Sequence, residues 1–266
     1  MKHKLLIGLT TLLLLTGTSA LMAQKKLFFI GDNDFPPFSF KQEGKIVGRD
    51  VEIVEAIAKR LKFEINIALF PFKRLLEFTK AGKCDGSFAL FKTPEREQFA
   101  HYVTAKPLHE STYKLFVLKG KSFPFTSLEH LKGKTIGKNL GFAVSPEFDK
   151  MVRENVIKVV EAEGIRRNMI NLYQGEVDAI SANYHVLLHM TRNDDSLANL
   201  IKKGGDYEAL ARPIKEQRGA FLVLSKAAKN IADKPAMVQK INRVIGEMQA
   251  DGSWGGIYQK YIGNGR

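Results

Sequence analysis

The chain has 266 residues, of which 44% are hydrophobic and 26% charged, a composition typical of a globular protein with room for two lobes. The formal charge is +13, but Lys and Arg are spread over every segment, with no basic arm and no basic–aromatic motif. The sequence therefore argues against nucleic-acid binding and assigns most of this charge to solvated surface.

The first 23 residues have the pattern of a secretory signal peptide. Lys2 and Lys4 precede an apolar run, Leu5–Leu15, and small residues follow it. We place the cleavage after Ala23, with Ala20 as the second choice. The apolar run is too short to cross a bilayer comfortably as a helix, so we expect no stable membrane insertion.

Cys84 is the only cysteine, so no disulfide can form within one molecule. No cysteine stands at the end of the signal to carry a lipid. We therefore expect a free protein in the periplasm, and we also expect it to be a monomer. Cys84 lies next to an apolar strand, which indicates a small buried hydrophobe rather than a reactive thiol.

Buried strands alternate with helices at the start of the mature chain. Leu27–Ile30 reads as a buried strand, and two consecutive prolines make 31–38 a loop at its carboxyl end. A helix with an apolar stripe follows, and Asp50 is placed to cap it. Alternating apolar residues at 63–69 predict a strand that is covered on one face.

Residues 81–96, AGKCDGSFALFKTPER, carry the main chemical signal. A helix is expected to stop at Gly82, because glycine accepts the left-handed conformation at a helix end. The short apolar run 87–91 predicts a buried strand. Pro94 disfavours helical geometry at Thr93 and suits the first turn of a new helix.

This arrangement places Arg96 just beyond a strand, beside a threonine hydroxyl and free backbone N–H groups. A guanidinium fork together with N–H donors recognises a small carboxylate. The alternative is that Arg96 pairs with Glu95 or Glu97 on a solvated helix start.

The second half of the chain predicts a similar series of elements. Ser145 caps a helix that has Pro146 in its first turn. The segment 175–179 repeats the pattern of 82–86, which is a helix end, two residues, an Asp and a strand. This repeat suggests two similar α/β lobes. Further strands are expected at 113–118, 156–160 and 219–224, and further helices at 165–175, 238–248 and 254–261.

Several ordered motifs resemble the bacterial extracellular solute-binding proteins of family 3, which capture polar amino acids. They are an aromatic-Pro-Phe element at 35–38, GxDVE at 48–52, TPER at 93–96, LKGKxxG at 131–137 and DGxxxxIYxKY at 251–261. The resemblance implies an α/β, two-lobed periplasmic-binding-protein type II fold.

In that fold each lobe is a mixed sheet flanked by helices, and two hinge crossings join the lobes. We place the first crossing at 109–112. Residues 24–110 and 216–266 are assigned to lobe 1, and residues 111–215 to lobe 2.

The resemblance also implies a ligand site between the lobes. The Arg of TPER clamps the α-carboxylate of the ligand in this family, and aromatic side chains at Phe35 and Phe72 pack on the ligand. Backbone donors of the strand before TPER and the Thr93 hydroxyl add further bonds. The expected ligand-binding residues are Asp32, Asp34, Phe35, Phe72, Ala89, Leu90, Phe91, Thr93, Arg96, Gly141, Phe142, Ala143 and Asn183.

The chain departs from the family pattern in the second lobe. Asn183 stands where family members place an Asp on the ammonium of the ligand, and Phe142 and Ala143 replace a Ser/Thr pair. A neutral amide offers no charge to an ammonium. The amine of an amino acid would then be held by Asp32 or Asp34.

We therefore expect a binding protein, not an enzyme, that captures an amino acid or related carboxylate for an ABC permease, with no cofactor or metal. The alternatives are a cyclohexadienyl-dehydratase-like enzyme and a ligand-presenting sensor component. The enzyme would need an acid/base pair facing the cleft; Asp32, Asp34 and Glu176 are the candidate carboxylates, and nothing in the sequence fixes them at catalytic spacing. His185 and His189 stand four residues apart but lack the glutamate of a zinc-binding HExxH helix.

Overall fold

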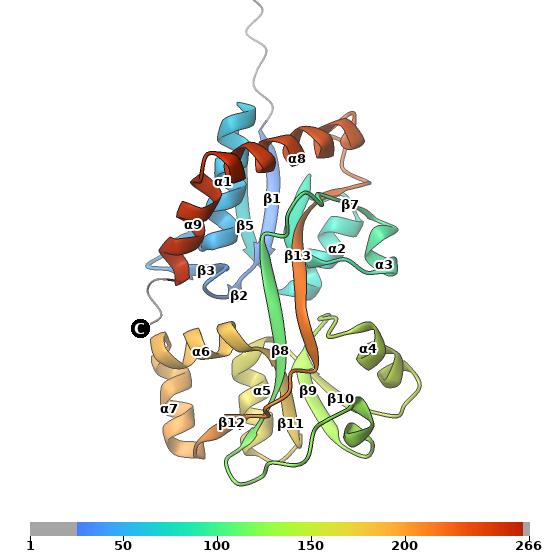
Figure 1. The fold of residues 1–266 in the computed structure, drawn as a ribbon, viewed down its shortest axis with the longest axis vertical. Helices are drawn as coiled ribbons and strands as arrows, with labels where there is room; N and C mark the ends of the chain where they lie inside the picture. Colours follow the sequence, from blue (N-terminus) through green and yellow to red (C-terminus); the bar gives the residue numbers. More distant parts are fainter. Residues whose placement is uncertain (1–25, 263–266) are drawn as a thin grey trace, which may run out of the picture.

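The structure is a computed structural model that describes residues 26–262. The predicted signal peptide lies outside the described residues. Two lobes lie one above the other and are joined by two long strands, β8 (His109–Leu118) and β13 (Lys215–Ser225) (Figure 1). No helix within residues 26–262 has the length and apolar character needed to cross a membrane.

The upper lobe in Figure 1 contains both the start and the end of the described chain. Its strands are β1 (Leu27–Asp32), β5 (Ile65–Phe70), β6 (Gly86–Phe91) and β7 (Ala100–Tyr102). Its helices are α1 (Arg49–Leu61), α2 (Phe72–Lys80), α3 (Pro94–Glu97), α8 (Lys234–Ala250) and α9 (Ser253–Ile262). A separate small sheet consists of β2 (Asp34–Phe35), β3 (Ser39–Gln42) and β4 (Lys45–Val47).

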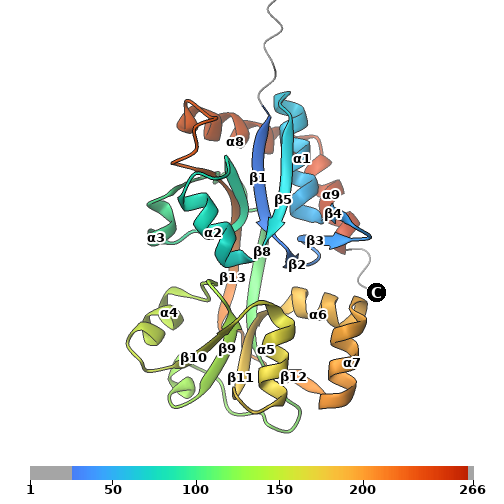
Figure 2. The same cartoon turned by 180° about the vertical axis from the view of Figure 1, so that it is seen from behind.

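The lower lobe is formed by the middle of the chain. Its strands are β9 (Thr135–Asn139), β10 (Lys158–Ala162), β11 (Ala179–Asn183) and β12 (Tyr207–Ala209). Its helices are α4 (Pro146–Arg153), α5 (Gly164–Tyr173), α6 (Tyr184–Asn193) and α7 (Asp195–Gly204), with a short 3-10 turn, η1 (Leu128–Leu131). Figure 2, seen from behind, shows α5 lying across the strands of this lobe.

One sheet of ten strands runs through both lobes, in the order β10-β9-β11-β8-β13-β6-β1-β5, with β12 beside β8 and β7 beside β13. We expected one sheet in each lobe. The two are continuous because the crossing strands pair with each other in antiparallel register, Glu110 opposite Gly219. The prediction of a mixed α/β fold with two crossings is confirmed.

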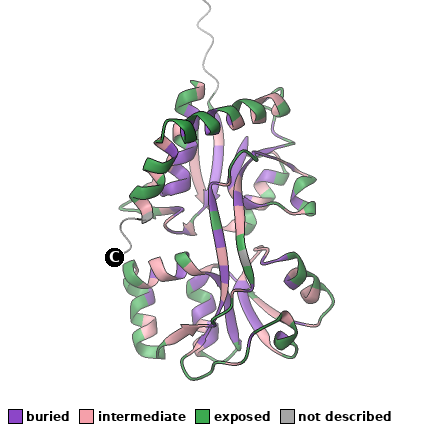
Figure 3. Cartoon of the chain, in the orientation of Figure 1, coloured by how far each residue is buried: buried purple, intermediate pink, exposed green. Residues whose placement is uncertain are grey.

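The core follows the alternation of side chains along the strands. On β1, Leu27 and Phe29 pack with α1 and α8, whereas Ile30 packs with Leu75 of α2 on the other face. Successive side chains of a strand point to opposite faces, so a central strand can be apolar throughout. Figure 3 shows buried residues along the strands and exposed residues on the outer faces of the helices.

The expected repeat between the lobes is confirmed in its hydrogen bonds. The carboxylate of Asp85 accepts a bond from the backbone N–H of Phe28, and that of Asp178 accepts one from the N–H of Thr135, each at 2.8 Å. Each Asp thus ties the start of one strand to the start of its parallel neighbour.

Three local predictions were wrong. Asp50 does not cap α1, because the helix begins at Arg49 after Gly48 and the Asp50 carboxylate is buried against His109. The predicted loop 31–38 contains β2, since the backbone of Asp34 and Phe35 pairs with β3. The strand expected at 156–160 lies two residues later, because β10 pairs with β9 from Lys158 onward.

Gly86 should tolerate no side chain. A Cβ atom there would lie 2.4 Å from the ring of Phe29 and 2.5 Å from the backbone oxygen of Val223. We expect Gly86→Ala to lower the free energy of unfolding by about 1–3 kcal/mol, which denaturant titration would measure. Gly246 in α8 faces open space, so Gly246→Ala should raise it by about 0.5–1 kcal/mol. Equal effects of the two changes would contradict this account of the packing.

Candidate functional site

A buried pocket lies between the lobes, at the carboxyl ends of β1 and β6. Its cavity volume is about 20 Å³, room for about one water molecule. The structure brings eight of the thirteen expected residues together here. The described residues that line the pocket are Asp32, Phe35, Phe72, Ala89, Phe91, Arg96, His109, Tyr113, Phe142 and Ala143.

Arg96 is set in place by the start of α3. The Thr93 hydroxyl caps this helix by accepting a bond from the backbone N–H of Arg96 at 3.3 Å. Pro94 occupies the first turn, where its missing N–H costs nothing. The sequence TPER therefore folds as predicted and directs the Arg96 side chain inward.

The Arg96 guanidinium is buried, with 6% of the residue exposed, and its hydrogen-bond partners are neutral. It donates to the backbone oxygens of Phe91 at 3.1 Å and Gly141 at 3.2 Å, and it lies 5.2 Å from the centre of the Phe72 ring. No described carboxylate forms an ion pair with it. Burial, the largest cause, lowers the pKa of Arg96.

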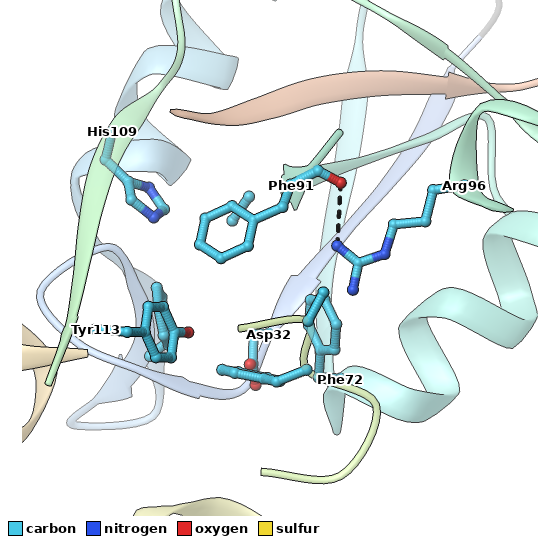
Figure 4. A pocket seen from close by; sticks show the side chains of 10 residues that line it. Asp32, Phe72, Phe91, Arg96, His109 and Tyr113 are labelled. Carbon is cyan, nitrogen blue, oxygen red and sulfur yellow. Dashed lines mark hydrogen bonds between the residues drawn. The ribbon is translucent and has the colours of Figure 1, made fainter. Parts of the chain in front are cut away.

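The expected surface pairing of Arg96 is not what the structure shows. Glu97 pairs instead with Lys92 at 3.0 Å, where both side chains are exposed. Arg96 points away from this exposed pair, toward Phe91 and the pocket (Figure 4).

The β6 strand bulges where it borders the pocket. Ala89 has a φ angle of +68°, and the pairing with β13 shifts register between Phe221 and Val223. A bulge leaves an extra residue outside the regular hydrogen-bond ladder. The backbone donors predicted for this strand are thus placed at its irregular part. Leu90 does not line the pocket, because its side chain packs in the core with Leu75.

Asp32 brings a carboxyl group into the same pocket as Arg96 (Figure 4). Only 6% of the residue is exposed, and burial raises the pKa of Asp32 to about 7. A backbone bond from Asp34, at 3.2 Å, opposes this shift. A cation placed beside Asp32 would favour its charged form.

Aromatic rings form most of the pocket wall. Phe142 makes edge contacts with Phe72, at 4.6 Å between ring centres, and with Phe35, at 5.9 Å. Phe91 packs edge-on against Tyr113 at 5.8 Å. These contacts connect both lobes, because Phe142 follows β9 and Phe72 begins α2. The wall therefore offers apolar surface and few polar partners.

The remaining expected residues lie around the pocket without lining it. Asp34 borders a neighbouring opening with Arg166, and Gly141 contributes the backbone oxygen bound by Arg96. Asn183 caps α6 with its side-chain oxygen, and its amide nitrogen donates to the Ser111 hydroxyl at 2.8 Å. Asn183 thus holds the lower lobe to the crossing strand. A binding role for these residues stays a prediction.

Sequence reasoning missed two lining residues, His109 and Tyr113, both on β8. His109 Nδ1 lies 2.6 Å from the Asp50 carboxylate, and Phe38 stacks on its ring at 3.9 Å. Burial raises the pKa of the Tyr113 hydroxyl far above its usual range, so it stays uncharged. The signal in the sequence was a histidine directly after the apolar Leu108, at the predicted crossing.

His185 and His189 have the spacing of metal ligands on a helix, but the sequence lacks the accompanying glutamate. Both lie on α6, and His189 packs edge-on against Phe40 at 5.6 Å. Across residues 26–262 the structure has no cluster of three or more His, Cys, Asp or Glu residues able to hold a metal ion.

The family described as bacterial extracellular solute-binding proteins, family 3, matches residues 27–264. The chain is 26% identical to the probable amino-acid-binding protein YxeM of Bacillus subtilis, over 85% of this chain and 80% of that protein. It is 25% identical to the arginine-binding extracellular protein ArtP of the same organism, over 90% of this chain and 87% of that protein. A probable histidine-binding protein of Campylobacter jejuni is 25% identical, over 86% of this chain and 81% of that protein.

Solved structures share the fold. An ancestral arginine-binding protein bound to arginine superposes with a TM-score of 0.72 and 26% identity, over 89% of this chain and 98% of that chain. A histidine kinase sensor domain also superposes with a TM-score of 0.72. It is 17% identical, over 90% of this chain and 97% of that chain. This second likeness concerns the fold alone.

Proposed function

The chain belongs to the bacterial extracellular solute-binding proteins of family 3, and from that premise we propose that it captures an amino acid or related small carboxylate between its lobes. The names of its relatives support this proposal, since they are amino-acid-binding, arginine-binding and histidine-binding proteins. We further propose that the protein acts as a monomer in the periplasm and delivers its ligand to an ABC permease. Residues 24–110 and 216–266 would form one lobe and residues 111–215 the other.

The buried guanidinium of Arg96 is the observation that carries the proposal. A buried charge is costly unless it is paired, and Arg96 has only backbone oxygens as bonding partners among the described residues. A ligand carboxylate would supply the missing charge through two charge-assisted bonds. The carbonyl of Gly141 would give up its bond to the ligand.

Asp32 offers the second half of an amino-acid site. Its carboxyl lines the same pocket, and an ammonium beside it would favour ionisation of the carboxylate. Asp32 would then take the role that Asn183 cannot, because Asn183 is committed to α6 and Ser111. The α-carboxylate and the ammonium of one ligand would each meet an opposite charge.

Ligand entry would require movement of the lobes. The cavity of about 20 Å³ is smaller than an amino acid, so the Phe72–Phe142 contact would have to open first. A ligand that contacts both lobes favours the closed arrangement by its difference in affinity for the two. β8 and β13 are the described strands that pass between the lobes and would bend.

A thermal-shift screen tests the proposed function. The purified protein is heated with each of the common L-amino acids and with the amine obtained by removing its carboxylate. At a concentration of 100 times Kd, a bound ligand adds about 2.7 kcal/mol to the free energy of unfolding. We expect at least one amino acid to raise Tm and its decarboxylated amine to have no effect. Equal shifts from an amino acid and its amine would contradict carboxylate recognition.

The enzyme alternative has no support among the relatives described above. They are named as binding proteins. Of the carboxyls considered for catalysis, Asp32 and Asp34 both border the neighbouring opening, and Glu176 lies in the turn before β11. We therefore propose binding and release without chemical change.

A further inference from the structure

His109 is a buried side chain with one nitrogen in use and one free. The residue is 3% exposed, and its Nδ1 lies 2.6 Å from Oδ2 of Asp50. Its ring is stacked on Phe38 at 3.9 Å and 20° between planes, so it cannot rotate freely. Nε2 has no hydrogen-bond partner among the described residues, although it is fully buried. Buried polar atoms are nearly always bonded in native proteins, so this one needs an explanation.

The hydrogen bond to Asp50 determines what Nε2 can do. A carboxylate accepts hydrogen bonds, so Nδ1 carries the proton and donates it. Arg49 Nε lies 3.8 Å from the other oxygen of Asp50, and these two buried charges offset each other. A neutral imidazole keeps this buried trio neutral overall. With its proton on Nδ1, the neutral ring presents Nε2 as an acceptor.

The pocket provides one site for each charge of an amino acid and none beyond that. Among the described lining residues, Asp32 is the only acid and Arg96 the only guanidinium or ammonium. Arg218 and Asp149 lie just outside the lining and have opposite charges that interact. The charged residues Asp34, Lys73, Glu163 and Arg166 border the adjoining opening and do not line this pocket. A charged ligand side chain directed toward His109 would therefore be buried without a counter-charge from the lining, which is costly.

His109 and Arg96 lie on opposite sides of the pocket, with Phe91 between them (Figure 4). A ligand whose carboxylate is bound at Arg96 and whose side chain extends past the Phe91 ring would reach His109. We propose that His109, oriented by Asp50, accepts a hydrogen bond from the ligand side chain, and that the ligand is an amino acid whose uncharged side chain carries a hydroxyl or amide donor. This inference rests on the proposed function, because it requires an amino acid in the pocket.

The proposed ligand differs from the arginine in the name of the relative ArtP. An apolar side chain would leave Nε2 without a partner, as it is now. A guanidinium side chain would satisfy Nε2 but bring a third ligand charge into a wall made mainly of Phe rings. Only an uncharged side chain with a hydrogen-bond donor both bonds to Nε2 and adds no further charge to the pocket.

Calorimetry with isosteric ligand pairs tests the inference on the wild-type protein. The pairs are threonine with valine, asparagine with leucine, and glutamine with methionine, and arginine, lysine and glutamate form the charged set. We expect at least one donor-bearing member to bind about tenfold tighter than its apolar counterpart. It should also bind tighter than every member of the charged set.

Two variants of His109 separate recognition from structure. His109→Asn keeps an amide N–H near the position of Nδ1 for Asp50 but has nothing at the position of Nε2. His109→Gln places a polar group near Nε2. The affinity ratio within the preferred pair should fall toward one in His109→Asn and recover in His109→Gln. A purely structural role would weaken both ligands of the pair alike and leave the ratio unchanged.

The outcomes distinguish this inference from the proposed function. Tightest binding by arginine, lysine, glutamate or an apolar amino acid would overturn the inference and leave amino-acid capture intact. An unchanged ratio in His109→Asn would likewise overturn the role of His109. If no amino acid binds the wild-type protein, the proposed function fails and the inference fails with it.

Discussion

Replacing Arg96 with alanine is expected to weaken binding of the amino-acid ligand by about 10- to 100-fold, since bonds between charged partners contribute about 1.5–3 kcal/mol. The truncation removes the only guanidinium among the described residues that line the pocket. The ligand carboxylate would then be buried without a counter-charge. Isothermal calorimetry at neutral pH measures the loss directly.

Two further variants make this result specific. Arg96→Lys keeps the charge but lacks the planar fork, so its affinity should fall between those of Arg96→Ala and the wild type. Arg243 is an exposed arginine on α8, far along the chain from the pocket. Arg243→Ala should bind as the wild type does. Wild-type affinity in Arg96→Ala would contradict the proposed clamp.

The unliganded protein is expected to lose stability as the pH rises from about 4 to about 7. Burial raises the pKa of Asp32 from 3.8 to about 7 in the folded chain, so the folded state holds this proton after the unfolded state has released it. Stability rises with pH only where the unfolded state binds more protons, and here it binds fewer. The contribution of Asp32 is therefore fully present below about pH 4 and lost by about pH 7, on the order of 4 kcal/mol.

Asp32→Asn should flatten this part of the pH profile of the free energy of unfolding. The reason is that an amide does not titrate. As a control, Asp206→Asn, at an exposed position, should leave the pH profile as in the wild type. Denaturant titrations at pH 4, 5, 6 and 7 give the comparison. The same slope in Asp32→Asn and the wild type would show that another group carries the pH dependence.

Asp32 also links ligand binding to proton release. An ammonium favours the charged carboxylate, so binding below pH 7 should release a proton, and affinity should increase as the pH rises toward 7. Calorimetry in two buffers of different ionisation enthalpy measures the proton count. We expect release in the wild type at pH 6 and none in Asp32→Asn.

The parts of the site that the sequence predicted are those that depend on neighbouring residues. Thr93, Pro94 and Arg96 form one short turn, so their geometry follows from local rules of helix capping. The strand before them could likewise be predicted from a short apolar run between turn signals. Arg96 could therefore be placed at a strand end from the sequence alone.

The parts that the sequence did not predict depend on contacts between distant segments. Asp50 looked like a helix cap, but its partner His109 is 59 residues away. Asn183 was predicted from its position in the family pattern, and the sequence did not reveal that it also caps α6 and donates to Ser111. No periodic pattern reports such pairs, because each depends on how the crossing strand meets both lobes.

The central claim is that the guanidinium of Arg96 binds the carboxylate of an amino acid between the lobes. A crystal structure of the complex with the tightest amino acid from the thermal-shift screen tests it most directly. We predict carboxylate oxygens about 2.7–2.9 Å from the Arg96 nitrogens, with the Gly141 bond released. An Arg96 that still bonds Phe91 and Gly141, while the ligand carboxylate lies elsewhere, would contradict the account.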